Sequence, residues 1–336
     1  MPDCGSQITL CDLPIHFDTY KGCSHGCKYC FASKKRNLND IRKYETPTQL
    51  LNFIKGKRNT TTNWCDWEIP IHWGGMSDPF QPVEATIRNT YNCLQILKET
   101  QYPFVVSTKG KLICRQDYLD LIKQCNCVVQ ISLVCPEFDK LEVGAPTFVE
   151  RLEMIRILSK HKRVIVRIQP YMVEVHDSIK QSIKQIAKAG AYGVTVEAMK
   201  FAKKKDGLIK VGGDFCYPKE ILIPRFRELK EIAHGNGLKF YSGENRLRDM
   251  GDSLCCCGID GLKGFIPNRF NLNNILNGNV VKPTKAMLQK GTAQVFKGKY
   301  QRAGTFDYMR NQTFKDLMLS ELKNNEEYYK QIFGKN

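Results

Sequence analysis

Hydrophobic residues along this chain follow two spacings. Short continuous runs of β-branched and aromatic residues predict buried strands, and the longer segments between them carry apolar residues at helical intervals. We expect strands near 69–75, 102–107, 127–134, 163–169, 192–197 and 237–242, with one more within 8–20. Continuous rather than alternating apolar runs are typical of parallel strands covered on both faces.

The intervening segments predict amphipathic helices, because their apolar residues fall on one stripe. We expect helices over 84–100, 115–124, 147–160, 176–189 and 219–235. The repeated strand–helix order predicts an α/β fold, a full or partial (β/α)6 TIM-type barrel, with a doubly wound open sheet as the alternative. In either architecture the functional residues belong at the carboxyl ends of the strands. We assign residues 1–243 to a partial-barrel core and residues 244–336 to a C-terminal extension.

The composition is that of an ordinary globular protein, with 336 residues, 42% hydrophobic and 25% charged. A chain of this length needs no disulfide or metal merely to fold. The N-terminal segment lacks the pattern of a secretory signal, and no run of 18 apolar residues occurs, which predicts a cytoplasmic protein without a membrane partner. Thiols stay reduced there, so closely spaced members of the 15 cysteines indicate metal or cluster ligands.

The net charge is +17, and much of it lies near the C-terminus. Residues 261–306 contain no Asp or Glu, while Lys and Arg alternate with aromatic residues. Basic side chains neutralise phosphates and aromatic rings stack on bases, so this segment predicts a nucleic-acid partner. The alternative is a solvated extension that packs on the barrel.

The strongest motif is a loop with three cysteines, Cys23, Cys27 and Cys30, directly after the first expected strand. Ferredoxin motifs differ in spacing and supply four thiolates. Zinc requires a fourth ligand, for which His25 is poorly placed between its neighbours. Three thiolates would leave one iron of a [4Fe-4S] cube open.

This motif, with Tyr29 directly before the third cysteine, resembles that of the radical S-adenosylmethionine (radical SAM) superfamily, and the likeness extends over residues 8–242. The resemblance implies a [4Fe-4S] cluster on Cys23, Cys27 and Cys30 whose open iron binds SAM. It also implies reduction by a donor such as flavodoxin or ferredoxin, and a 5′-deoxyadenosyl radical that abstracts hydrogen from a substrate.

The same resemblance implies further cofactor-binding residues at the strand ends. The segment 72–78 is similar to the glycine-rich turn that binds the SAM amino group, Ser132 would bond the ribose, and Arg167 would meet the carboxylate. For each, a purely structural role is the alternative. The full expected set is Tyr29, Gly74, Gly75, Met76, Ser77, Asp78, Ser132, Arg167 and Glu197.

A narrower resemblance rests on GCSHGCKYCFA (22–32), SDPFQPVE (77–84), RLEMIRIL (151–158) and VIVRIQP (164–170). These segments resemble those of the spore photoproduct lyase group, also labelled DNA repair photolyase-like. Those lyases reverse a thymine dimer and return hydrogen from a cysteine placed before the Ser-Asp pair. Here that position holds Gly75, or Met76 with a shift of one, so thymine-dimer repair itself is not implied.

A replacement hydrogen donor is expected among Cys255, Cys256 and Cys257, with Cys135 as a further candidate catalytic thiol. Three consecutive side chains do not easily converge on one metal, because neighbours diverge in both strands and helices. An auxiliary metal site built from two of them and a distant residue such as Cys216 is the alternative, as is a set of bystander thiols.

These observations predict a radical SAM enzyme that repairs or modifies DNA or RNA. One alternative retains the radical chemistry but acts on a peptide, protein or small molecule. The other is a non-catalytic, metal-containing nucleic-acid-binding protein.

Overall fold

The computed structural model describes residues 1–4, 11–57, 69–211 and 214–267. Its centre is an eight-stranded sheet in the order β1-β2-β5-β6-β7-β8-β9-β12. All strands from β2 onward are parallel, and β1 pairs antiparallel with β2. The bounds are β1 Asp3–Cys4, β2 Ile15–Phe17, β5 Ile71–Trp73, β6 Phe104–Thr108, β7 Cys127–Ser132, β8 Val164–Tyr171, β9 Gly193–Ala198 and β12 Lys239–Ser242.

Every strand expected from the hydrophobic runs is present, and the predicted partial barrel is confirmed. β1 and β12 are the two edges of the sheet, so within the described residues the barrel stays open. The inner strands are buried on both faces, as their continuous apolar runs predict.

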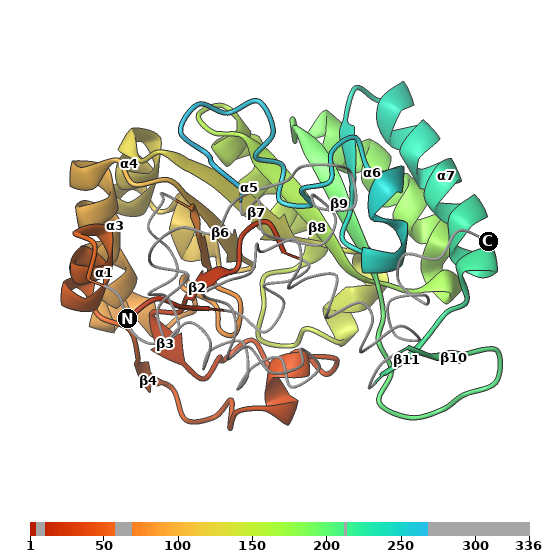
Figure 1. Cartoon of the computed structure of the whole chain (residues 1–336), viewed down its shortest axis with the longest axis horizontal. Coiled ribbons are helices and arrows are strands. Elements are labelled where there is room, and N and C mark those ends of the chain that lie inside the picture. The colour runs from red at the N-terminus through yellow and green to blue at the C-terminus, as the bar shows by residue number, and fades with distance from the viewer. Residues whose placement is uncertain (5–10, 58–68, 212–213, 268–336) are drawn as a thin grey trace, which may run out of the picture.

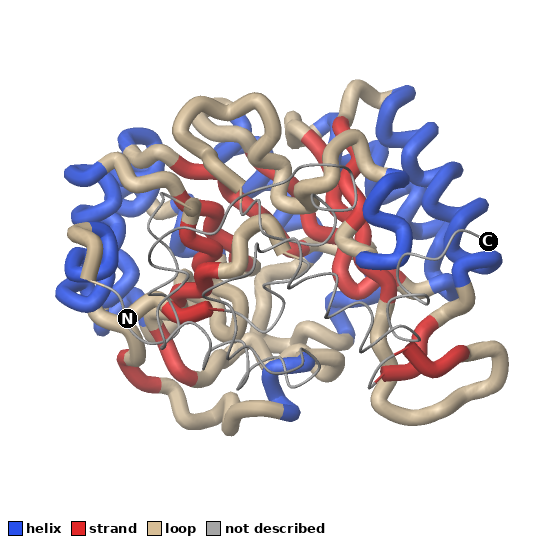
Figure 2. The backbone as a smooth tube through the Cα atoms, viewed as in Figure 1, coloured by secondary structure: helices blue, strands red, loops and turns tan. Residues whose placement is uncertain are grey.

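Helices cover the outside of the sheet, and neighbours in sequence pack side by side (Figures 1 and 2). They are α2 Glu84–Ile87, α3 Asn89–Thr100, α4 Gln116–Gln124, α5 Phe148–Ser159, α6 His176–Lys188 and α7 Lys219–Gly235. The helix expected over 84–100 is broken at Arg88, whose φ is +55°. The buried Glu84 carboxylate accepts hydrogen bonds from the backbone N–H groups of Thr90 and Tyr91, and so caps α3.

Two short strand pairs and one helix were not expected; strands of two or three residues carry no readable periodicity. They are the β3–β4 pair (Tyr20–Lys21 and Arg42–Lys43), helix α1 (Pro47–Ile54) and the β10–β11 pair (Ile209–Val211 and Asp214–Cys216). Helix α1 does have a sequence signature, a capping box of Thr46 and Gln49 with Pro47 at the first helical position. The β10–β11 hairpin extends away from the main sheet (Figure 1).

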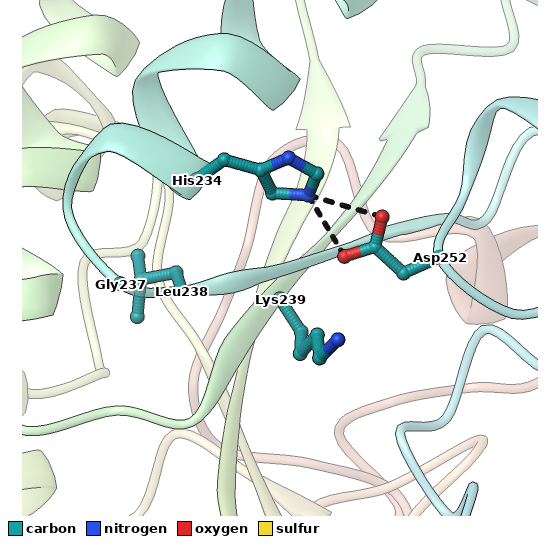
Figure 3. A pocket seen from close by; sticks show the side chains of 5 residues that line it. All are labelled: His234, Gly237, Leu238, Lys239 and Asp252. Carbon is teal, nitrogen blue, oxygen red and sulfur yellow. Dashed lines mark hydrogen bonds and ion pairs between the residues drawn. The ribbon is translucent and has the colours of Figure 1, made fainter.

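The described part of the C-terminal extension packs into the same core as the sheet. After β12 the chain forms a 3-10 helix, Asn245–Met250, and then returns along β12. Asp252 exchanges hydrogen bonds with the backbone of Phe240, and its carboxylate lies 2.9 Å from His234 Nε2 (Figure 3). Asp252 and His234 line a surface hollow of about 440 Å³ at the amino end of β12. This end of the sheet is opposite the strand ends where the functional residues are expected.

Most of the basic segment 261–306 lies outside the described residues, so its expected role stays a prediction. Among the residues that are described, none of the helices combines the length and the apolar character needed to cross a membrane.

Candidate active site

The three-cysteine loop follows β2 and β3 and is fixed by backbone hydrogen bonds. Cys23 N donates to Leu38 O (2.9 Å), and Lys28 N donates to Leu141 O (2.8 Å). Gly22 begins the loop with φ +83°, where a Cβ would lie 2.6 Å from a backbone oxygen. All three thiols are free and partly exposed. The loop therefore presents Cys23, Cys27 and Cys30 as available ligands.

The arrangement fits a polynuclear cluster. Electrostatic interactions connect the Cys27 thiol to those of Cys23 and Cys30, so the three groups form one set. A zinc ion needs its ligands at a single point, whereas a cluster binds each thiolate to a different iron.

His25, the conceivable fourth zinc ligand, is engaged elsewhere. Its Nδ1 lies 3.0 Å from Gly144 O, and its Nε2 lies 3.1 Å from a carboxylate oxygen of Asp78. Although burial alone would raise it, the neighbouring His25 charge and several hydrogen bonds lower the pKa of Asp78 to about 2.

Asp78 therefore ties the cysteine loop to the carboxyl end of β6. It accepts hydrogen bonds from Thr108 Oγ1 (2.7 Å) and Lys109 N (2.6 Å) in addition to the ion pair with His25. Asp78 is one of the expected cofactor-binding residues, and in this structure its side chain holds the cysteine loop in place.

Tyr29 enters a buried network that the sequence did not predict. Its hydroxyl donates to the Glu142 carboxylate, which also pairs with Arg151 (2.5 Å) and Lys109 (3.7 Å). Arg151 donates to Ser132 O (2.8 Å), so the network joins two of the expected cofactor residues. The sequence did contain an indication of this network, because Arg151 interrupts the apolar stripe of α5 at a buried position.

The glycine-rich turn after β5 is held by the end of β2. The Asp18 carboxylate accepts from the backbone N–H groups of Met76 (3.1 Å) and Ser77 (3.2 Å). Gly74 has φ +89°, and a Cβ there would lie 2.3 Å from Ser107 O, so this position requires glycine. At Gly75 an added Cβ would make only an ordinary contact, 3.4 Å from His16.

A row of polar side chains, here called the polar belt, crosses the sheet from β5 to β9. His72 Nε2 lies 3.0 Å from Ser107 Oγ, and Ser107 donates to Gln130 Oε1 (2.8 Å). The belt continues through Arg167 and Gln169 to Glu197. It consists of His72, Ser107, Gln130, Arg167, Gln169 and Glu197.

The belt brings Arg167 and Glu197 together, 3.8 Å apart, as expected for residues at one site. Glu197 also pairs with Lys200 at 2.8 Å. Burial lowers the pKa of His72 well below its ordinary value, so its imidazole is neutral. Because Ser107 gives its only proton to Gln130, His72 Nε2 is the donor in its own bond to Ser107.

The cysteine run 255–257 lies in a turn, and its thiols contact one another. Cys257 makes thiol–thiol contacts with both Cys255 and Cys256, the latter at 4.0 Å. The argument that three consecutive side chains do not easily converge on one metal ion stays a prediction, because it was made for strands and helices and this run lies in a turn. Gln130 Nε2 donates to Cys257 O at 3.5 Å, which places this run beside the polar belt.

Cys135, a candidate catalytic thiol, and Cys216, a candidate ligand of an auxiliary metal site, have other neighbours than this run. Cys135 is fully buried and contacts Glu137 and Ser178 of α6 in the outer helical layer. Cys216 lies near Arg246, Glu244 and Lys200. The residue that joins the run is instead Cys11, which no sequence signal connected to it.

No family model matches this chain. Uncharacterized proteins of Mycobacterium tuberculosis and Mycobacterium bovis are 28% identical over 234 residues, which is 65% of this chain and 68% of theirs. A structure of spore photoproduct lyase complexed with dinucleoside spore photoproduct superposes with a TM-score of 0.53 at 16% identity, over 68% of this chain and 77% of that one. A variant of that lyase with bound AdoMet and the same dinucleoside gives a TM-score of 0.51 at 16% identity, over 68% and 76%.

The open parallel sheet, with the cysteine loop after its first parallel strand, is a partial TIM-type α/β barrel. Solved structures of spore photoproduct lyase share this fold. The resemblance predicted from the cysteine motif is thus confirmed at the level of the fold.

Proposed function

We propose that this protein is a radical SAM enzyme, with a [4Fe-4S] cluster on Cys23, Cys27 and Cys30. The observation that carries the proposal is three free, partly exposed thiols on one fixed loop at the carboxyl end of the first parallel strand. When bound, the cluster supplies the electron that cleaves SAM and so starts hydrogen abstraction. The protein supplies ligands, orientation and exclusion of water.

The chain's own residues are suited to these tasks. The His25–Asp78 pair and the Tyr29–Glu142–Arg151 network hold both sides of the cysteine loop against the sheet. Arg167 offers a guanidinium group that suits the carboxylate of SAM, and Gly74 lets the backbone approach a ligand closely. Gln130 and Glu197 orient Arg167 for that role.

For the substrate we propose a nucleic acid that is repaired or modified. The +17 charge and the basic, aromatic segment 261–306 support this, as does the dinucleoside bound in the matching lyase structures. The corresponding hydrogen-donor position is Gly75, which has no thiol. Reversal of a thymine dimer by the same route is therefore not proposed.

The test is anaerobic reconstitution with iron and sulfide, followed by SAM and dithionite. We expect a brown protein that releases 5′-deoxyadenosine, whereas Cys23→Ala, Cys27→Ala and Cys30→Ala abolish that release. Cys114→Ala is the matched control, because Cys114 is partly buried and lies outside both cysteine sets. A colourless, zinc-loaded wild-type protein without SAM cleavage would overturn the proposal.

The substrate class is tested by the same reaction in heavy water with single-stranded DNA, RNA or peptides added. We expect deuterium exchange into 5′-deoxyadenosine to depend on a nucleic acid and to weaken with salt. Exchange that depends on a peptide or small molecule instead would favour the alternative substrate class.

A further inference from the structure

A second set of four thiols lies outside the cysteine loop. Cys255, Cys256 and Cys257 come from the turn after β12, and Cys11 comes from the segment that precedes β2. Electrostatic interactions connect Cys11 to both Cys256 and Cys257. Because Cys257 also contacts Cys255 and Cys256, all four thiols form one group, here called the second thiol set.

The turn that carries three of these thiols is firmly held. Asp252 fixes its start to β12 through Phe240 and to α7 through Lys230 and His234. Its end is fixed by Arg163, which donates to Gly258 O (3.0 Å) and Asp260 O (2.7 Å). Gly258 has φ +66°, and a Cβ there would lie 2.4 Å from Ile165. The position of these three thiols is therefore built into the fold.

An arginine adjoins the second thiol set. Arg248 is only 7% exposed, and its guanidinium contacts Cys256 and interacts with Cys11. Its Nε is buried and has no hydrogen-bond partner among the described residues. A buried N–H without an acceptor destabilises the fold, so its presence points to a ligand that accepts from it.

We propose that Cys11, Cys255, Cys256 and Cys257 bind a second iron–sulfur cluster, next to Arg248 and separate from the Cys23–Cys27–Cys30 loop. Four thiolates satisfy every iron of a cubane cluster, whereas the three of the loop leave one iron open. The thiolates and cluster sulfides carry net negative charge, which Arg248 offsets while its Nε gains an acceptor.

This site goes beyond the proposed function and does not depend on it. The loop follows β2, while the second thiol set joins the segment before β2 to the turn after β12. Its position next to Gln130 of the polar belt would place the second cluster beside the region where SAM and substrate are proposed to bind.

The experiment uses the full-length variant Cys23→Ala/Cys27→Ala/Cys30→Ala, which lacks the loop ligands. After anaerobic reconstitution we expect about four irons and four sulfides per chain, roughly half the wild-type content, with charge-transfer absorbance and an electron paramagnetic resonance signal after reduction. Adding Cys255→Ala/Cys257→Ala to this variant removes that iron, and adding Cys114→Ala does not. Cys11→Ala is the milder variant, because Cys11 is partly exposed and its loss leaves the core intact.

The proposal is overturned if the loop-free variant, with a wild-type circular dichroism spectrum, holds no more iron and sulfide than the variant that lacks both sets. Stoichiometric zinc that persists during iron reconstitution would overturn it equally. If the wild type carries two clusters but never cleaves SAM, the proposed function fails and the second site stands. If it carries one cluster and cleaves SAM, the second site fails alone.

Discussion

The imidazole of His25 lies 3.1 Å from the carboxylate of Asp78, although 52 residues separate them along the chain. His25 belongs to the cysteine loop, and Asp78 follows β5 and binds the backbone at the end of β6. One buried ion pair thus fixes the loop against two strands of the sheet. A residue that the spacing offers as a zinc ligand instead positions the cysteines.

This pair predicts a loss of stability in acid. The pKa of Asp78 falls from 3.8 to about 2 on folding, so its ionised form stabilises the folded state above pH 4. That contribution, about 2 kcal/mol, disappears as the pH drops from 4 toward 2. Asp78→Asn should flatten the dependence of the unfolding free energy on pH in this range, measured by urea denaturation. The exposed Asp206→Asn is the control, and an unchanged acid slope in Asp78→Asn would contradict the prediction.

Arg151 should be among the most sensitive residues of the helical layer. It is fully buried and neutralises Glu142 at 2.5 Å. Arg151→Met leaves that carboxylate without its main partner and should cost about 3–5 kcal/mol of unfolding free energy. Lys111→Met, which breaks the exposed pair with Glu150, should cost less than about 1 kcal/mol. Similar losses in the two variants, measured by chemical denaturation, would refute the role assigned to Arg151.

The two glycines after β5 should respond differently to alanine. Gly74→Ala places a methyl group 2.3 Å from Ser107 O at a positive φ, and should cost about 1–3 kcal/mol. Gly75→Ala meets only an ordinary contact and should stay within about 0.5 kcal/mol of wild type. Thermal unfolding measures both. If Gly74 lies against SAM, its variant should also bind SAM more weakly, and equal behaviour of the two variants would argue against this picture.

Gln130 is expected to hold the polar belt together. It is fully buried and accepts hydrogen bonds from Ser107 (2.8 Å) and Arg167 (3.3 Å). Gln130→Leu leaves both donors without that acceptor and should cost about 1–3 kcal/mol in unfolding free energy. SAM affinity, measured by equilibrium dialysis, should fall with it, because Arg167 loses its orientation. The exposed Gln116→Leu should change neither quantity, and a Gln130 variant of wild-type stability and affinity would count against the belt.

The strands, most helices and the cysteine loop could be predicted because each is a local pattern. Continuous apolar runs specify buried parallel strands, and the spacing of Cys23, Cys27 and Cys30 is a property of eight consecutive residues. The break at Arg88 and the short β10–β11 hairpin were missed. The first depends on a cap provided by Glu84 across a turn, and the second is too short to show periodicity.

What the sequence by itself determined is the order of the strands and helices and the three-thiol loop, since both depend on neighbouring residues. Only the tertiary structure decided which distant side chains meet. It paired His25 with Asp78, joined Tyr29 to Arg151 through Glu142, and added Cys11 to the run after β12. The physical reason is that such contacts depend on how the strands stack and where the loops return, which residue spacing along the chain does not encode.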